Sequence, residues 1–150
     1  MPCFSRNMAL VVHASCVALA GRAVLLLGES GAGKSDVALR LIELGGLLVS
    51  DDQTVLELSE DGELVASSPP AIAGLIEVRH VGLYRVPFVQ KVPVVLAVEL
   101  CFPGDVLPRL PETYFESFLD RPVQKLKLVG CEASTPVKIK IATREERQDD

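Results

Sequence analysis

The sequence contains no C-x-x-C pair, no excess of basic residues and no long apolar run. Its four cysteines are widely separated, so neither a zinc cluster nor a redox pair is indicated, and we expect reduced thiols in a cytosolic protein. The net charge of −5 and the pI near 5.1 argue against nucleic acid as the main ligand, because a phosphate backbone requires a basic face. No segment reaches the roughly eighteen apolar residues of a membrane span, so no membrane partner is predicted.

The composition is that of one globular domain. The chain has 150 residues, of which 49% are hydrophobic and 23% are charged, and this length is sufficient to bury a core. We therefore predict a single domain over residues 1–150, in which residues 143–150 form a charged, frayed tail. The apolar stretch that begins at Met8 loosely resembles a secretory signal, but His13 and Ser15 interrupt it.

A glycine-rich segment between a predicted strand and a predicted helix is the most informative feature. Residues 22–27 are apolar after Arg22 and predict a buried strand, whereas residues 36–44 carry apolar residues at helical spacing. The segment between them satisfies every fixed position of the phosphate-binding pattern G-x-x-x-x-G-K-[ST]. It reads Gly28-Glu29-Ser30-Gly31-Ala32-Gly33-Lys34-Ser35.

Each residue type in this segment meets a demand of polyphosphate binding. Glycine lets backbone N–H groups wrap closely around an anion, and the following helix presents its unpaired N–H groups and positive dipole end. The Lys34 ammonium can bridge the outer phosphates, and the Ser35 hydroxyl can bind magnesium. The alternative is a glycine-rich turn that binds no ligand. Such a turn requires one or two glycines but does not require a lysine and a serine after them. The segment therefore predicts an ATP-type phosphate site.

Several polar residues are expected near this site. Residues 47–49 predict a buried strand that delivers Asp51 and Asp52 to the edge where open α/β sheets bind ligands. A turn or a helix cap is the alternative role for this acidic pair, but no helix is predicted after it. His13 would lie beside the glycine-rich segment, although a histidine in an apolar strand is more often a hydrogen-bonded core residue. Glu77 and Arg79, two residues apart on an extended chain, would face the same side.

The remaining elements are predicted to be mostly strands. An Asp-Gly hairpin is expected to join residues 54–58 to residues 63–66, and residues 94–98 are expected to form a central strand. A short helical turn is expected at residues 71–75, and an irregular excursion is expected at residues 102–122, with a helical turn around residues 112–119. Residues 125–128 and 137–141 alternate apolar and charged residues and predict two strands with one wet face. The predicted fold class is α/β, a mixed sheet with few helices.

Taken together, these features resemble the catalytic domain of HPr kinase/phosphorylase from about residue 8 to about residue 142. The motifs that carry the resemblance match in order and spacing. They are His13 before the loop, the loop at residues 28–35, the pair Asp51-Asp52, and a Glu-x-Arg-x-x-Gly signature at residues 77–82. A phosphate-binding loop alone would not select this family.

The resemblance implies a P-loop domain like that of phosphoenolpyruvate carboxykinase. The implied activity is ATP-dependent phosphorylation of a serine of HPr, the small phosphocarrier of the sugar phosphotransferase system, with reversal by phosphorolysis. In the family, the loop and its lysine bind nucleotide phosphates, the loop serine and signature glutamate hold magnesium, and the second aspartate exchanges the proton, with the histidine close by. Carried over, these roles fall on Lys34, Ser35, Glu77, Asp52 and His13. Asp51 would orient or support the metal shell, and Arg121 is matched to a later active-site arginine.

The sequence departs from the family pattern in three places. We expect the long N-terminal domain of the family to be absent, and the loop after Gly82 lacks the usual glycines. Near the end, the family's Pro-x-Arg-Pro-Gly-Arg segment, which serves dephosphorylation, is replaced by residues 142–147 without the helices that help to build the family's hexamer. In these respects the chain resembles the short members of the family from alphaproteobacteria.

Two other interpretations of the motifs remain open at this stage. A small-molecule kinase or general P-loop NTPase would use Glu99, after the apolar residues 94–98, as its metal-binding acid. A nucleotide-sensing module would bind ATP without transferring phosphate.

Overall fold

The computed structural model describes residues 8–144 and residue 148, and it contains eleven strands and two α-helices in this part of the chain. The strands are β1 (Ala9–Val12), β2 (Ser15–Leu19), β3 (Arg22–Leu27), β4 (Leu47–Ser50), β5 (Thr54–Leu58), β6 (Leu64–Ser67), β7 (Leu75–Val78), β8 (Gly82–Arg85), β9 (Val92–Cys101), β10 (Tyr114–Phe118) and β11 (Arg121–Val129). The helices are α1 (Lys34–Glu43) and α2 (Thr135–Arg144), and a short 3-10 turn, η2, spans Pro70–Ile72.

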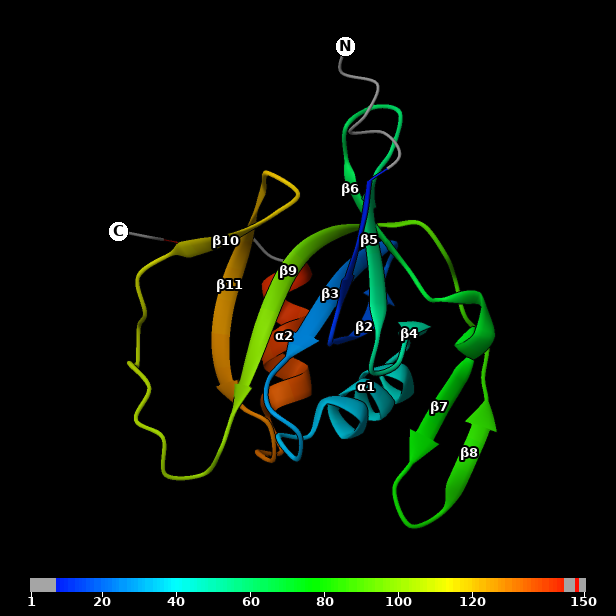
Figure 1. Ribbon diagram of the computed structural model, residues 1–150. Coiled ribbons are helices and arrows are strands. Elements are labelled where there is room, and N and C mark those ends of the chain that lie inside the picture. The colour runs from blue at the N-terminus through cyan, green and yellow to red at the C-terminus, as the bar shows by residue number, and fades with distance from the viewer. Residues whose placement is uncertain (1–7, 145–147, 149–150) are drawn as a thin grey trace.

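One mixed sheet organises these elements (Figure 1). Its strands follow the order β1-β5-β6-β9-β3-β2-β4, and β11 pairs with β9 and with β10. Strands β3, β9 and β11 are parallel, and β4 has the same direction because β2 is antiparallel to both β3 and β4. The loops that follow β3 and β4 therefore leave the sheet at the same edge, which is where the candidate site lies.

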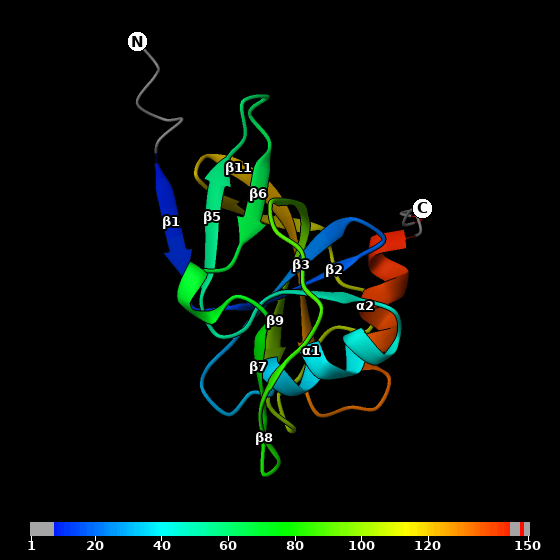
Figure 2. The same cartoon turned by 90° about the vertical axis from the view of Figure 1, so that its right-hand side faces the viewer.

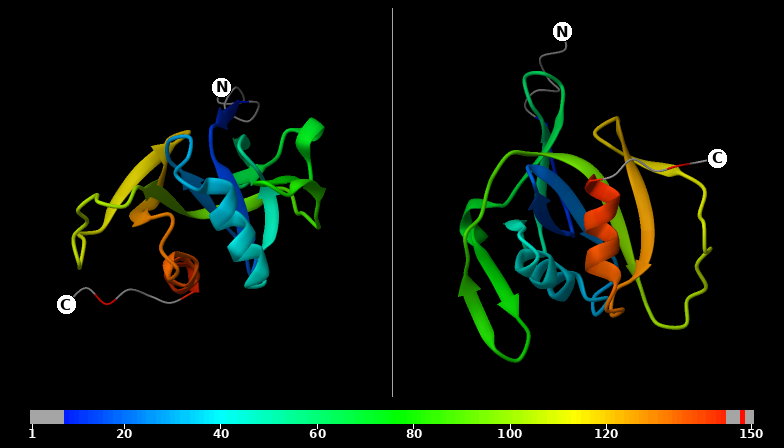
Figure 3. Two further views of the ribbon diagram at one scale, coloured as in Figure 1. Left: turned by 90° about the horizontal axis from the view of Figure 1, so that it is seen from below. Right: turned by 180° about the vertical axis from the view of Figure 1, so that it is seen from behind.

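Both helices cover the same face of the sheet, as the view from below shows (Figure 3). Val37 of α1 and Ile139 of α2 belong to one buried cluster with Val24 of β3. The neighbouring Leu25 points to the other face and packs in a second cluster with residues of β5 and β6. Because β3 is buried on both faces, its sequence is continuously apolar rather than alternating.

Two peripheral parts of the fold complete the architecture. Strand β1 lies beside β5 at one edge, so the apolar stretch at residues 9–12 is part of the sheet (Figure 2). Strands β7 and β8 form a separate two-stranded hairpin that projects beside α1 (Figure 1), and Ile76 anchors it in the core under that helix. None of the helices within residues 8–144 is long and apolar enough to cross a membrane.

Most of the predicted elements are confirmed. Residues 22–27 form β3, the helix follows the glycine-rich segment, and β4 precedes the acidic pair. The hairpin of β5 and β6 and the central strand β9 also lie where the sequence placed them. The fold is a mixed β-sheet with two helices.

Three predictions about the C-terminal third are wrong. Residues 137–141 are part of helix α2 rather than a strand, because Ile139 packs into the core under α1. The helical turn expected within residues 112–119 is strand β10, which pairs with β11. Helix α2 also continues through Arg144, so the expected tail cannot begin at residue 143, while residues 145–147 and 149–150 lie outside the described part of the chain.

Candidate functional site

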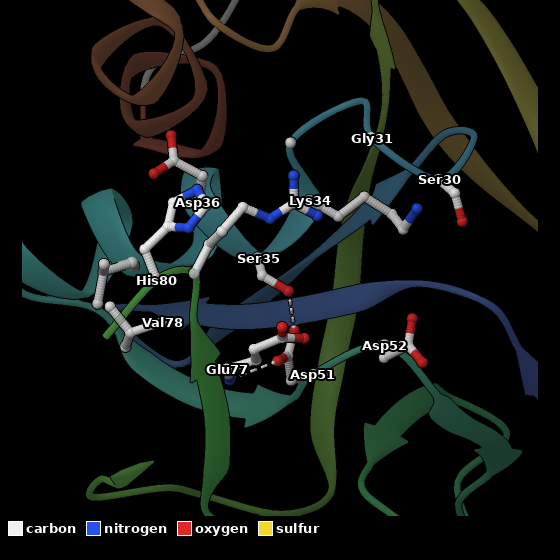
Figure 4. Close-up of a pocket in the computed structure, with 13 residues that line it drawn as sticks. Ser30, Gly31, Lys34, Ser35, Asp36, Asp51, Asp52, Glu77, Val78 and His80 are labelled. Atoms are coloured by element: carbon white, nitrogen blue, oxygen red, sulfur yellow. Dashed lines mark hydrogen bonds between the residues drawn. The ribbon is translucent and has the colours of Figure 1, made fainter. Parts of the chain in front are cut away.

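A pocket of about 580 Å³ lies where β3 and β4 end. The residues that line it come from the glycine loop, which we define as residues 28–35, from the first turns of α1, from the acidic pair, and from β7 and the turn after it. Figure 4 shows that Lys34, Ser35, Asp51, Asp52 and Glu77 surround this space. The structure thus brings together residues that are up to 50 positions apart in the sequence, from Ser30 to His80.

The backbone of the glycine loop is held in a conformation that requires glycine. Gly33 precedes α1 with a φ of 99°, a left-handed value that L side chains rarely adopt. Outside the loop, Gly130 packs so closely that a Cβ atom there would lie 2.2 Å from the carbonyl oxygen of Ala32. The loop therefore rests against the segment that follows β11.

Arg40 fixes that segment to α1. Its Nη2 donates to the carbonyl oxygen of Gly130 at 2.7 Å, and its Nη1 donates to that of Glu132 at 3.1 Å. The guanidinium also forms an i,i+4 ion pair with Asp36 at 3.1 Å. One side chain thereby links the helix that follows the glycine loop to the segment that supports the loop from behind.

Lys34 folds back over its own loop. Its Nζ donates to the carbonyl oxygens of Gly28 at 2.8 Å and Glu29 at 3.2 Å, and the residue is only 7% exposed. A buried ammonium is stable only when it is paired or fully hydrogen-bonded, so these carbonyl contacts position the charge at the wall of the pocket. An anion within the pocket would offer the same ammonium a stronger, charge-assisted partner.

Asp51 is the centre of the hydrogen-bond network beside the loop. Its Oδ1 accepts from the hydroxyls of Ser15 at 2.8 Å and Ser35 at 2.6 Å, and its Oδ2 accepts from the backbone N–H of Glu77 at 3.0 Å. The residue is 7% exposed. This carboxylate joins β2, α1, β4 and β7, which are the elements that surround the pocket.

Asp52, unlike the buried Asp51, is exposed. Its side chain is 64% exposed and accepts a hydrogen bond from His13 Nε2 at 2.8 Å, and the His13 side chain is itself 57% exposed. The residue has a φ of 70°, in the left-handed region that residues other than glycine adopt uncommonly and that aspartate adopts more often than most. Because of this turn, one acid points into the protein and the next points into the pocket. His13 is therefore a partner of the pocket acid and not a core residue.

The β7–β8 hairpin supplies the remaining wall. Glu77, Val78, Arg79 and His80 line the pocket, and Figure 4 shows Glu77 next to Asp51 and Ser35. The side chains of Ser35, Asp51 and Glu77 offer hydroxyl and carboxylate oxygens, which are the donors that a hard divalent cation prefers. No cluster of three or more His, Cys, Asp or Glu residues with metal-binding geometry occurs within the described residues, so a magnesium ion here would also need phosphate or water oxygens.

Two residues considered from the sequence lie apart from this pocket. Arg121 begins β11, so it lies at the opposite end of the parallel strands, where its Nε donates to the carbonyl oxygen of Gly62 at 2.8 Å. Glu99 alternates along β9 with the buried Val98, which packs toward the helices, so its side chain belongs to the other face. There it forms an ion pair with Lys125 at 3.2 Å.

Sequence reasoning missed Ser15, Arg40 and Gly130. Arg40 lies next to the buried face of a predicted helix, and its position in the sequence does not indicate that it bonds to Gly130, which is 90 residues away. Ser15 is a polar residue in an otherwise buried apolar strand, and this was the signal that could have identified it.

The comparison with known proteins agrees with this arrangement. Residues 6–92 match the family model described as the HPr Serine kinase C-terminal domain, and this segment includes every pocket residue discussed above. The HPr kinase/phosphorylase of Peptoclostridium acidaminophilum is 36% identical over 125 residues, and the match covers 77% of this chain and 41% of that protein. The enzyme of the same name from Caldicellulosiruptor bescii is 42% identical over 74 residues, which are 49% of this chain and 24% of that protein.

A solved structure extends the likeness beyond the segment that the family model matches. The structure of the Hpr(Ser) kinase/phosphatase from Coxiella burnetii superposes with a TM-score of 0.79 at 28% sequence identity, covering 90% of this chain and 88% of that one. The chain spans less than half the length of the two relatives above, 41% of the first and 24% of the second. The family model nevertheless matches more than half of the chain, and the chain belongs to the HPr serine kinase C-terminal domain family.

Proposed function

We propose that this protein is an ATP-dependent protein serine kinase whose substrate is the phosphocarrier HPr. The observation that carries the proposal is the division of labour between the adjacent acids, in which buried Asp51 is bonded to Ser35 of the glycine loop while exposed Asp52 faces the same pocket. Family membership supports HPr as the substrate, because the relatives are named HPr kinase/phosphorylase. A phosphate-binding loop beside an exposed carboxylate is the minimum that phosphoryl transfer to a hydroxyl requires.

The glycine loop would bind the phosphates of ATP. The four N–H groups at the start of α1 have no acceptor within the helix, and they and the helix dipole favour an anion at that position. Lys34 would exchange its carbonyl partners for the outer phosphates, since a charge-assisted hydrogen bond to phosphate is stronger than one to a neutral carbonyl. This P-loop role for residues 28–35 accounts for the glycine at position 33 and for the buried lysine after it.

Magnesium would be held by the hydroxyl of Ser35 and the carboxylate of Glu77, with Asp51 supporting the hydroxyl from behind. When bound, the cation neutralises charge on the transferring phosphoryl group. A site of one hydroxyl and one carboxylate suits magnesium, which keeps several water or phosphate ligands.

Asp52 would act as the general base. As the serine oxygen of HPr forms its bond to the terminal phosphorus and the bond to ADP breaks, the serine proton passes to the Asp52 carboxylate. His13 donates to the same carboxylate and orients it. In phosphorolysis, an oxygen of inorganic phosphate would form its bond to the phosphorus of phosphoserine as the bond from phosphorus to the serine oxygen breaks, which yields pyrophosphate. The protonated Asp52 would give its proton to the departing serine oxygen, so the same residues serve both directions.

Neither Arg121 nor an oligomer takes part in the proposed reaction. Within one chain Arg121 is bonded to the β5–β6 loop and does not line the pocket, so it takes no part in the steps described here. A hexamer, as in the family, is not needed for any of these steps.

The direct test is incubation of the purified protein with HPr and γ-labelled ATP in the presence of magnesium. We expect label on a serine of HPr, and none when that serine is replaced by alanine. Hydrolysis of ATP that does not depend on HPr would instead favour a general NTPase. Binding of ATP without transfer or hydrolysis would favour a nucleotide-sensing module.

A further inference from the structure

Ser15 is the only residue among those described above whose side chain contacts both acids of the pair. Its hydroxyl donates to Asp51 Oδ1 at 2.8 Å and accepts from the backbone N–H of Asp52 at 3.1 Å. The residue begins β2 and is completely buried, with 0% exposure. A single hydroxyl therefore bridges the carboxylate of Asp51 and the backbone of Asp52.

The polarity of Ser15 has no explanation other than these two contacts. Its neighbours Ala14, Cys16 and Val17 are fully buried and apolar, and an alanine would continue the same strand. Burial of a hydroxyl is unfavourable unless both its donor and its acceptor functions are satisfied. Here the Asp51 carboxylate satisfies the donor function and the backbone N–H of Asp52 satisfies the acceptor function, so the residue is matched to this pair of positions rather than to the core.

The contact with Asp52 is the more consequential of the two. Asp52 has a φ of 70°, a conformation that is strained for a residue with a side chain and persists only when the surroundings hold it. The Ser15 oxygen accepts from the N–H of this very residue. The rest of the junction is also fixed, because Thr54 Oγ1 donates to the carbonyl oxygen of Ala14 at 2.8 Å and the N–H of Gln53 donates to the carbonyl oxygen of Asp51 at 2.8 Å.

We propose that Ser15 is a positioning residue for phosphoryl transfer, which ties the direction of the Asp52 carboxylate to the buried Asp51. This inference rests on the proposed function, because it concerns the base of that reaction. Through Asp51 the hydroxyl is linked to Ser35 and the metal side of the pocket, and through the Asp52 backbone to the carboxylate that takes the proton. One side chain, which would touch neither nucleotide nor HPr, thereby fixes the metal side of the pocket relative to the carboxylate that takes the proton.

The test compares Ser15→Ala with Thr54→Val. Both remove one completely buried hydroxyl from the same strand junction, but only Ser15 contacts the acids. For Ser15→Ala we expect kcat for transfer to HPr to fall about ten-fold, because a misaligned base loses the benefit of orientation. The KM for ATP should change less than about two-fold, since the glycine loop and Lys34 keep their contacts. Ser15→Thr, which keeps the hydroxyl, should restore most of the kcat.

A second measurement reports on position without activity. Amide hydrogen exchange at Asp52, followed by NMR, should become about ten-fold faster in Ser15→Ala, because its acceptor is lost, and should not change in Thr54→Val. If Ser15→Ala does not fold, Ser15→Cys takes its place, since the thiol is a much weaker donor.

The outcomes separate the inference from the proposed function. Wild-type kcat in Ser15→Ala, or an equal fall in Ser15→Ala and Thr54→Val, overturns the positioning role. If the wild-type protein transfers no phosphate to HPr, the proposed function fails, and the exchange data then decide the structural claim by themselves. If amide hydrogen exchange at Asp52 is unchanged in Ser15→Ala, the claim that Ser15 positions Asp52 is overturned. Faster exchange in Ser15→Ala but not in Thr54→Val supports the claim.

Discussion

Lys34 Nζ donates a hydrogen bond of 2.8 Å to the carbonyl oxygen of Gly28, the first residue of its own glycine loop. The lysine is therefore already held at the pocket before any ligand is considered. Because its partners are neutral carbonyls, their loss in Lys34→Ala should cost only about 1 kcal/mol of folding stability. Transfer of phosphate from ATP should fall about 100-fold, because the ammonium is the strongest donor available to the outer phosphates.

Thermal unfolding and labelled-ATP transfer measure the two effects of Lys34→Ala separately. Lys138→Ala is a suitable control, because Lys138 lies on α2 and its ion pair within residues 8–144 is with the exposed Glu132, at 3.5 Å. Unchanged transfer in a folded Lys34→Ala protein would remove the glycine loop from the mechanism.

Glu77 and Glu99 offer a discriminating pair of substitutions. Glu77→Gln retains the backbone N–H that binds Asp51 but loses the charge that a hard cation prefers, so the magnesium concentration for half-maximal activity should rise about ten-fold. Glu99→Gln should leave that concentration unchanged, because Glu99 pairs with Lys125 on the other face of the sheet. A titration of activity against magnesium provides the measurement. The opposite pattern would favour the general NTPase with Glu99 as its metal-binding acid.

The sequence was sufficient to predict the strands and loop that build the pocket, because their signals are local. The glycine loop has a fixed pattern, β3 and β4 are short apolar runs, and the acidic pair follows β4 directly. The contacts among these residues could not be predicted in the same way. The hydrogen bond between Ser15 and Asp51 spans 36 positions, and no pattern within a strand indicates its partner.

The errors at the C-terminal end also have physical causes. The alternating residues 137–141 suit a strand, but Ile139 and Thr143 are buried four positions apart, as one face of a helix requires. Pro136 in the first turn was an overlooked helix signal. The hairpin of β10 and β11 turns at Leu119 and Asp120, which have φ values of 50° and 62° without any glycine. The usual sequence signal for such a turn was therefore missing.

Arg40 is expected to couple stability to nucleotide affinity. Arg40→Ala removes the hydrogen bonds to Gly130 and Glu132 and should lower the free energy of unfolding by about 1–2 kcal/mol. Because Gly130 supports Ala32 of the glycine loop, the KM for ATP should rise several-fold as well. Arg22→Ala is the matched control. Arg22 also donates to a carbonyl oxygen, but that oxygen belongs to Thr143, which lies away from the pocket. An equal rise in KM in both variants would show that lost stability alone explains the effect.

Lys125 predicts a pH dependence of stability. Burial disfavours its ammonium, but hydrogen bonds and attraction from Glu116 and Glu99 outweigh that effect and raise the pKa of Lys125 above its ordinary value. A raised pKa in the folded state means that the stabilisation is complete below the unfolded pKa of about 10.4 and is lost as the pH rises through the folded pKa. The stability difference between the wild type and Lys125→Met should therefore be constant from pH 7 to pH 9 and shrink above about pH 10.4.

Urea unfolding across this range measures that difference. Lys127→Met serves as the control, because Lys127 lies two residues further along β11 and is exposed. A difference that stays constant up to pH 11 would mean that Lys125 contributes through packing of its stem rather than through its charge.

The last prediction separates the two acids. Asp51→Asn places an amide where the carboxylate accepts from two hydroxyls and a backbone N–H, so at least one of these donors is left unpaired. We expect a loss of about 2 kcal/mol in the free energy of unfolding. Asp52→Asn, with its side chain 64% exposed, should be as stable as the wild type and bind ATP normally. Its transfer of phosphate to HPr should nevertheless fall about 1,000-fold, because the amide cannot take the serine proton.

The measurements are urea unfolding, ATP binding and transfer of phosphate to HPr. We expect Asp51→Asn to lose stability, and Asp52→Asn to lose transfer while it keeps stability and ATP binding. This difference decides which acid is the base. Asp61→Asn, an exposed acid on the β5–β6 loop, controls for the general effect of removing one negative charge. Wild-type transfer in Asp52→Asn would contradict the general-base role. If a stably folded Asp51→Asn lost transfer at the same time, the base would be the buried acid, and the serine of HPr would have to approach from the side of Ser35 and Glu77 rather than from the side of His13.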